Sequence, residues 1–145
     1  MQTECISDQY DFEGFDGRRV VAAFDGGALS SDAGALLRRQ TERAIGLFAR
    51  VAACFVDHRA AELTVHGLPA MVGQRIAGIA LGYEDIDDHD ELRHDPVLAL
   101  LSDRLETKRD DCAALAGKST LNRLEHAPMG APTRYHKIGH DAGVE

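Results

Sequence analysis

Acidic and histidine side chains crowd one short stretch of this chain, from Leu81 to Pro96. Carboxylates and imidazoles bind metal ions and transfer protons, so this composition suggests a metal site or an acid/base centre. A calcium loop needs Gly at its sixth position and Glu at its twelfth, and a loop starting at Asp85 would have Asp90 and Pro96 there. A two-metal nuclease site would collect its carboxylates from several separated elements instead of one local run. We therefore expect the segment to cap helices and to be solvated, and a small metal-dependent hydrolase is the less favoured alternative.

The spacing of the histidines gives no stronger metal signal. His136 and His140 have the separation of zinc ligands on one helix, but Lys137 follows His136 where a metalloprotease has Glu. His89 and His94 are expected to point to different faces. Solvated histidines are therefore the prediction, and no metal ligand is expected among them.

The short helix predicted from Ser119 to His126 offers different chemistry. Ser119 is its expected N-cap, and Leu121 and Leu124 form its inner face. Its outer face would be polar and partly basic, and it would carry Lys118, Ser119, Thr120, Asn122 and Arg123. Side chains of these kinds contact phosphates and base edges, so the helix is a candidate for binding DNA. A plain amphipathic helix docked on a bundle is the alternative.

The stretch Gly117-Lys118-Ser119-Thr120 also looks like the end of a phosphate-binding loop. That motif needs another glycine five residues earlier and a buried strand before it. Cys112 occupies the glycine position, and the preceding residues are charged or alanine-rich. No nucleotide site is predicted.

Bulk composition is that of one ordinary globular domain. The 145 residues suffice for a core, no apolar run is long enough to cross a membrane, and no signal peptide is expected. Three widely spaced cysteines fit a reducing cytoplasm. The net charge of −8 argues against tight nonspecific binding of nucleic acid, but residues 17–83 carry eight bases and five acids. A local basic face remains compatible with this distribution.

The N-terminal third predicts one strand and one helix. Residues 1–17 are expected to form an irregular acidic arm, and the apolar run from Arg18 to Phe24 a short strand buried on both faces. A helix is predicted over residues 32–45, capped by Ser30, Ser31 or Asp32. Its inner face would comprise Leu36, Leu37 and Ala44. Its outer face would carry three further candidates for DNA contact, Arg38, Arg39 and Arg43.

Helices are also expected in the middle of the chain. Residues 47–55 suggest a helical segment that is followed by a loop at 57–59, and residues 64–81 give the clearest helix. The expected apolar stripe of that helix comprises Leu68, Val72, Ile76, Ile79 and Tyr83. Gly73 and Gly78 lower its intrinsic helicity and would be tolerated where another helix packs closely.

The acidic segment predicts two helix starts. Asp88 and Glu91 have the spacing of a capping box, and Asp95-Pro96 places Asp at the cap and Pro at the first helical position. The second helix would carry apolar side chains as far as Leu105 into the core. Residues 102–111 would then form a charged connector, and residues 128–145 a loose tail.

Three ordered segments resemble one family. They are Phe24–Leu37, Ala80–Pro96 and Ser119–Glu125. Together they are similar to the motifs of the bacterial insertion-sequence DDE transposases of group 1. The resemblance extends to residues 134–138 and so covers nearly the whole chain.

The resemblance implies a longer protein with an RNase-H-like core, in which three carboxylates bind two Mg²⁺ or Mn²⁺ ions for strand transfer. In the family the first catalytic Asp lies on a strand beyond the third motif, and no such strand occurs in this sequence. Asp25, Asp85 and Asp90 belong to the motifs but not to the catalytic triad.

We therefore expect a mainly α fold with one strand near residues 18–24, disordered termini, and a mostly helical region at 18–127. The implied role is binding of transposon terminal repeats, without catalysis by this chain. The alternative is a non-catalytic fragment that associates with a full-length transposase, or an inactive remnant.

Overall fold

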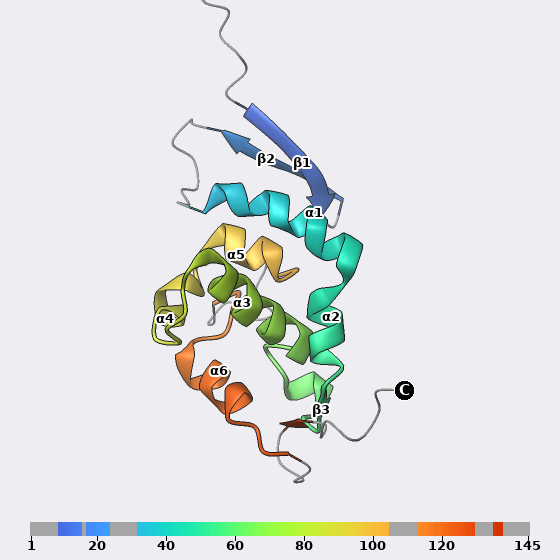
Figure 1. The fold of residues 1–145 in the computed structure, drawn as a ribbon, viewed down its shortest axis with the longest axis vertical. Helices are drawn as coiled ribbons and strands as arrows, with labels where there is room; N and C mark the ends of the chain where they lie inside the picture. The colour runs from blue at the N-terminus through green and yellow to red at the C-terminus, as the bar shows by residue number, and fades with distance from the viewer. Residues whose placement is uncertain (1–8, 16, 24–31, 105–112, 130–134, 138–145) are drawn as a thin grey trace, which may run out of the picture.

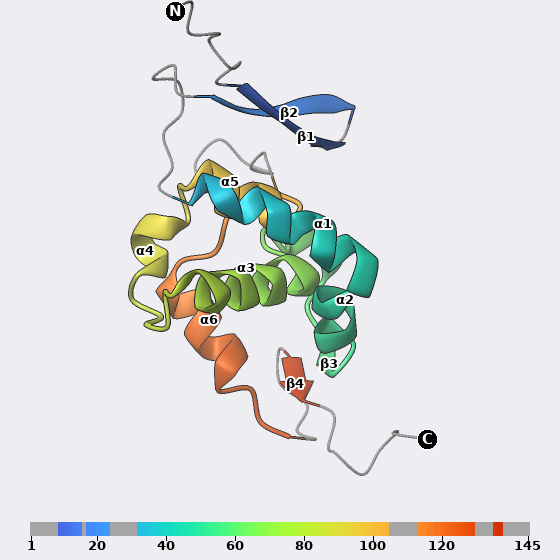
Figure 2. The same ribbon diagram turned by 45° about the horizontal axis from the view of Figure 1, so that its top comes forward.

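Helix α3 (Leu68–Leu81) lies at the centre of the molecule, between two apolar cores (Figures 1 and 2). The computed structural model describes residues 9–15, 17–23, 32–104, 113–129 and 135–137. The other α-helices are α1 (Leu36–Ile45), α2 (Leu47–Ala52), α4 (His89–Leu92), α5 (Pro96–Leu101) and α6 (Lys118–Glu125). The predicted mainly α fold is confirmed.

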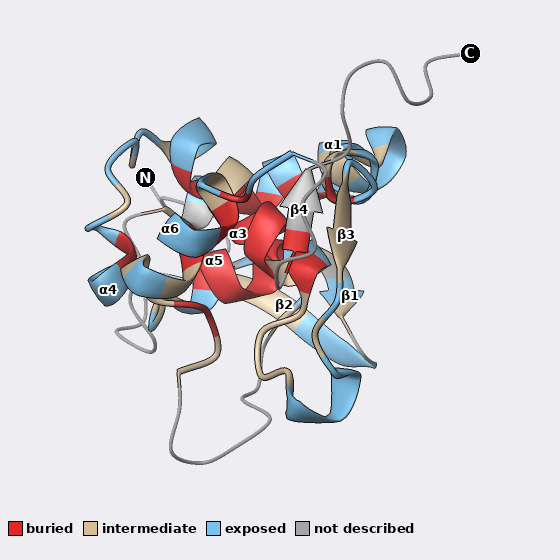
Figure 3. Cartoon of the chain, turned by 90° about the horizontal axis from the view of Figure 1, so that it is seen from below, coloured by how far each residue is buried: buried red, intermediate tan, exposed pale blue. Residues whose placement is uncertain are grey.

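The two cores lie on different sides of α3. One core contains Leu36 of α1, Ala77 of α3 and the whole apolar stretch of α5 from Val97 to Leu101. The other contains Met71 and Val72 of α3, with residues of α2 and α6. Figure 3 shows the buried positions concentrated on α3 and α5, whereas the outer side of α6 is exposed.

The N-terminal region forms an antiparallel hairpin of β1 (Gln9–Phe15) and β2 (Arg18–Ala23). The strand expected at 18–24 is confirmed through Ala23, but it is not buried on both faces, because it is only half-buried at Val20 to Ala22. The expectation of an irregular arm over residues 1–17 is wrong for β1. Phe12 and Phe15 of β1 pack on the first core, so the strand is stabilised by a partner and a surface that local sequence does not reveal.

Helix α1 begins later than predicted and turns a different face inward. A 3₁₀ turn (Ala33–Ala35) precedes it, and no side chain caps it at its first residue. Leu36 is buried as expected, but Leu37 is 62% exposed and Ala44 is exposed, whereas Arg39 is only 4% exposed. The proposed caps Ser30 and Ser31 lie outside the described residues. The prediction of the buried face of α1 is wrong because the β1–β2 hairpin covers a side of the helix that would otherwise be exposed to water.

A second two-stranded sheet replaces two predicted irregular segments. β3 (Phe55–Asp57) pairs antiparallel with β4 (Tyr135–Lys137). Phe55 was expected in a helix, Asp57 in a loop and Tyr135 in a loose tail, and all three expectations are wrong. Tyr135 is 4% exposed and packs in the second core. A pairing between segments so distant in sequence leaves no local pattern.

Helix α3 starts at Leu68 instead of Thr64, which follows a 3₁₀ turn (Ala61–Leu63). Its glycines allow the close packing that the sequence predicted. A Cβ added at Gly73 would lie 2.9 Å from Cδ2 of Phe48, and one added at Gly78 would lie 2.9 Å from Cε1 of His89. α2 and α4 therefore approach α3 where it lacks side chains.

Gly73→Val should lower the free energy of unfolding by about 1–3 kcal/mol, because its methyl groups must displace the Phe48 ring. Ala80→Val is the matched control, since it adds the same branching at an exposed position of the same helix. Urea denaturation of both variants measures the difference. Equal midpoints for the two variants would contradict the close approach.

Candidate nucleic-acid interface

The start of α6 is fixed by a side chain from another helix. Asp90 Oδ1 of α4 accepts a hydrogen bond from the backbone N–H of Lys118 at 3.0 Å. Gly117 is the N-cap residue and supplies no side chain, so the prediction that Ser119 caps the helix is wrong. A Cβ at Gly117 would lie 2.8 Å from Asp90 Oδ1, so the absence of a side chain there makes room for the cap.

A buried amide ties the segment before α6 to α3. Gln74 Nε2 donates to the carbonyl of Ala116 at 2.7 Å, and Gln74 Oε1 accepts from the N–H of Ala116 at 2.9 Å. Gln74 Nε2 also lies 3.1 Å from Nδ1 of His89. An amide that donates to Ala116 and to His89 leaves Nδ1 as the acceptor, so the neutral imidazole carries its proton on Nε2.

His89 is fully buried, so the prediction of a solvated histidine is wrong for this residue. Its Nε2 has no hydrogen-bond partner within the described residues. Burial lowers its pKa below the ordinary value of 6.5, and the positive charge of Arg75 adds to this effect. His94 is exposed, as expected.

Four side chains form one exposed stripe on α6. They have the three- and four-residue spacing of one helical face, with the last at the C-cap, and are Ser119, Asn122, Arg123 and His126. The opposite face buries Leu121 and Leu124. We call these four residues the α6 stripe; it combines hydrogen-bonding groups with a guanidinium and carries no acid.

The flanking candidates Lys118 and Thr120 have neighbours of their own. Lys118 Nζ lies 3.3 Å from Asp87 Oδ1 and 3.9 Å from Asp90 Oδ2, so nearby carboxylates offset its charge. Arg123 Nη2 donates to the Thr120 hydroxyl at 3.3 Å. Of the candidates predicted on this helix, Ser119, Asn122 and Arg123 are therefore the most available for binding.

The arginines of α1 do not join this surface. Figures 1 and 2 show α1 and α6 on opposite sides of α3. Arg38 and Arg43 are exposed, and Arg38 donates to the carbonyl of Ala80. Arg39 is buried, stacks 5.0 Å from the Phe15 ring centroid and lies 3.6 Å from Asp103, so its predicted outward position is wrong. The predicted DNA-contact residues therefore form two separate groups, one on α6 and one on α1.

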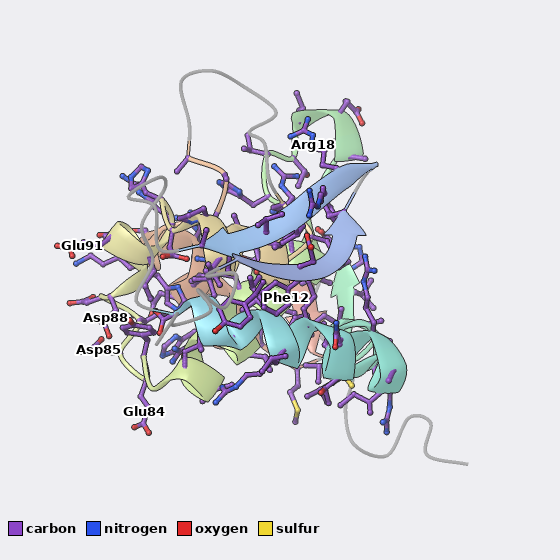
Figure 4. All side chains as sticks on the ribbon, turned by 90° about the horizontal axis from the view of Figure 1, so that it is seen from above. Phe12, Arg18, Glu84, Asp85, Asp88 and Glu91 are labelled. Atoms are coloured by element: carbon purple, nitrogen blue, oxygen red, sulfur yellow. The ribbon has the colours of Figure 1, made fainter. Side chains whose placement is uncertain are left out.

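Most of the described contacts of the acidic segment, Leu81 to Pro96, stabilise the fold. Asp95 Oδ1 caps α5 by accepting from Leu98 N–H at 2.8 Å, with Pro96 at the start of the helix, as predicted. Asp88 makes no side-chain cap bond, so the predicted capping box is wrong. Figure 4 shows four acids projecting outward along one edge of the molecule, namely Glu84, Asp85, Asp88 and Glu91.

Other carboxylates are held in ion pairs. Glu125 Oε1 accepts from Arg75 Nε, and Arg75 also donates to the carbonyl of Glu84 at 2.7 Å. Arg59 binds both oxygens of Asp57, and this hydrogen bonding holds the pKa of Asp57 below its usual value. Within the described ranges, no three His, Cys, Asp or Glu side chains gather as metal ligands.

The family model for transposase DDE domain group 1 matches residues 12–140. The chain belongs to this family. No curated protein and no solved structure matches it. Membership establishes a transposase-related function, and in the described part of this transposase no helix is long and apolar enough to cross a membrane.

The divalent metal that the family implies does not fit the described acids. Asp90 and Asp95 cap helices, Asp57 and Glu125 pair with arginines, and Glu84, Asp85, Asp88 and Glu91 project outward. These residues therefore do not form a site that would hold the metal. Asp25, His140 and Cys112 lie outside the described residues, as do the side chains of His136 and Lys137.

Sequence reasoning missed the pair formed by Gln74 and His89. A signal was present for Gln74, which is an isolated amide among the small and apolar residues of α3. Such a residue needs a buried partner. Its partner could not be named, because Ala116 is distant in sequence.

Asp90→Ala should lower the free energy of unfolding by about 1 kcal/mol, since α6 loses its cap. Asp88→Ala removes another exposed carboxylate, which makes no cap bond, and should change stability much less. Chemical denaturation of the two variants compares them. A larger loss from Asp88→Ala would contradict the assigned cap.

Stability should fall as the pH drops below about 6.5, because the unfolded chain then protonates His89 while the folded chain keeps it neutral. The slope is at most about 1.4 kcal/mol per pH unit for each such group. His66, whose pKa is also lowered, contributes with the same sign. Above this pH, the contribution of these two histidines to the free energy of unfolding is retained.

Denaturation midpoints at several pH values measure this dependence. His89→Gln should flatten it, and His94→Gln, at an exposed position, is the control for the substitution itself. An unchanged pH dependence in His89→Gln would show that the imidazole does not carry the effect.

Proposed function

We propose that this chain binds DNA at the ends of a transposable element and that the α6 stripe makes the contact. The observation that carries the proposal is the exposure of Ser119, Asn122, Arg123 and His126 on one face of a helix in a DDE transposase. Asn and Arg are the side chains that make bidentate contacts with adenine and guanine in the major groove.

The anchoring of α6 supports this role. Asp90 fixes its first turn, and Arg75 binds Glu125 in its last turn. Leu121 is fully buried and Leu124 nearly so. A helix held at both ends presents its outer side chains in a defined geometry, which specific recognition of DNA requires.

We further propose that the carboxylates for strand transfer come from outside the described residues. This is supported by the roles that Asp57, Asp90, Asp95 and Glu125 already have, since each of them caps a helix or pairs with an arginine. Freeing Asp90 for a metal would remove the cap of α6. The described part of the chain then serves binding and not strand transfer.

A second candidate function is association with a full-length transposase, as a non-catalytic partner. The observation that favours it is an apolar hollow of about 300 Å³ between α1, α2 and α3. Its lining includes Ile45, Phe48, Ile76 and Leu101. Ile45 of this lining is 53% exposed, and Ile79 of α3 is 48% exposed, so apolar side chains at the hollow are open to a partner.

The double variant Asn122→Ala/Arg123→Ala should weaken binding to a duplex carrying the terminal repeats by about tenfold or more, and it should reduce the preference over a scrambled duplex. Lys118→Ala should have a smaller effect, because Asp87 and Asp90 already offset its charge. Fluorescence anisotropy at two salt concentrations gives affinity, preference and salt dependence.

Arg50→Ala is the matched control for lost charge, since Arg50 is exposed on α2. It should leave the preference for the terminal repeats unchanged. Equal affinity for the two duplexes, or undiminished binding by the double variant, would refute the α6 interface. Magnesium- or manganese-dependent cleavage by the wild-type chain would refute the non-catalytic assignment.

A further inference from the structure

Positive side chains converge near the start of α3, on residues that the α6 interface does not use. Arg104 Nη2 donates to the carbonyl of Val65 at 3.3 Å, which brings its guanidinium beside His66. Burial lowers the pKa of His66, and the charges of Arg104, Arg59 and Arg93 add to this effect, whereas a hydrogen bond to the backbone of Ala114 opposes it. No carboxylate contributes to this shift, so His66 lies in a cationic neighbourhood.

The nearby acids are engaged elsewhere. Asp103 precedes Arg104 but lies 3.6 Å from Arg39, and its backbone takes the left-handed conformation with φ of 53°. Asp57 pairs with Arg59 at 2.7 Å. Asp90 lies beside Gly117, where it caps α6. Among the described residues, no ion pair involves Arg104.

Two buried donors in the segment that follows α5 lack partners among the described residues. Arg104 Nε and the hydroxyl of Ser102, two residues earlier, are both buried and make no hydrogen bond with the described residues. Ser102 as a whole is only 5% exposed. A buried donor without an acceptor is unfavourable, and one on a guanidinium more so, because the charge is also desolvated. An anion with several oxygens would satisfy such donors and offset the charge.

We propose that Arg104 and His66, flanked by Arg93, form a binding site for a phosphate oxyanion. Guanidinium, imidazolium and hydroxyl groups are the side chains that bind phosphate, and Arg does so with a planar fork of donors. The phosphate could belong to the DNA backbone or be a free ion. The site does not depend on the α6 stripe, so the two proposals fail separately.

Sulfate is the probe, because its charge stays constant while His66 titrates. The imidazole signals of wild-type His66 are followed by NMR across pH, in sodium sulfate and in sodium chloride of matched ionic strength. Sulfate should raise the pKa of His66, since the bound anion favours the protonated ring. Identical titrations in the two salts would overturn the site.

Arg104→Gln should weaken the sulfate effect on His66 about tenfold or more, since it removes a charge-assisted hydrogen bond. Arg50→Gln, which removes an exposed charge on α2, should keep the full effect. An undiminished effect in Arg104→Gln would overturn the site. If Arg104→Gln does not fold, Arg104→Lys retains the charge and should weaken sulfate binding by losing the fork; its sulfate affinity then decides the question.

DNA binding by the same variants identifies the source of the phosphate. If the site holds the DNA backbone, Arg104→Gln should reduce the slope of log affinity against log salt by about one for any duplex. If it holds a free ion, that slope is unchanged while the sulfate effect on His66 is lost.

Discussion

The amide of Gln74 is the interaction on which the arrangement of this molecule depends. It makes two hydrogen bonds with the backbone of Ala116 and a third contact with the ring of His89, all in the buried interior. These bonds tie the central helix to the segment that leads into α6 and to the acidic helix α4. Breaking them would leave buried polar groups on three elements without partners, which costs more than the bonds themselves contribute.

That bond network explains why the acidic segment is structural. With His89 held under α3, the next residue, Asp90, reaches the first N–H of α6, and Gly117 leaves room for it. The negative charge of Asp90 also interacts favourably with the positive end of the α6 helix dipole. The cluster that looked like a metal centre therefore positions the helix that we propose for DNA contact, while its outward acids remain exposed.

Local patterns predicted the helices that carry their own signals. The 3.6-residue periodicity of α3, the Asp95-Pro96 start of α5 and the apolar face of α6 were each sufficient to predict the element, although some boundaries moved by several residues. The strands β1, β3 and β4 were missed because a short strand is decided by its partner and by the surface it covers. Phe12, Phe55 and Tyr135 show this, since each packs against residues that are far away in sequence. The three-motif resemblance was confirmed by the match over residues 12–140.

The sequence by itself determined the family, the helical character and the chemical types on the α6 stripe, because these follow from local residue order. Only the tertiary structure decided which charges are available. Arg39 and His89 are buried, Lys118 is offset by Asp87 and Asp90, and Arg123 remains exposed. The physical reason is that burial and pairing depend on neighbours brought together by folding. A titratable side chain has the same identity in the sequence whether it lies in water or in a core, and its chemistry differs between the two.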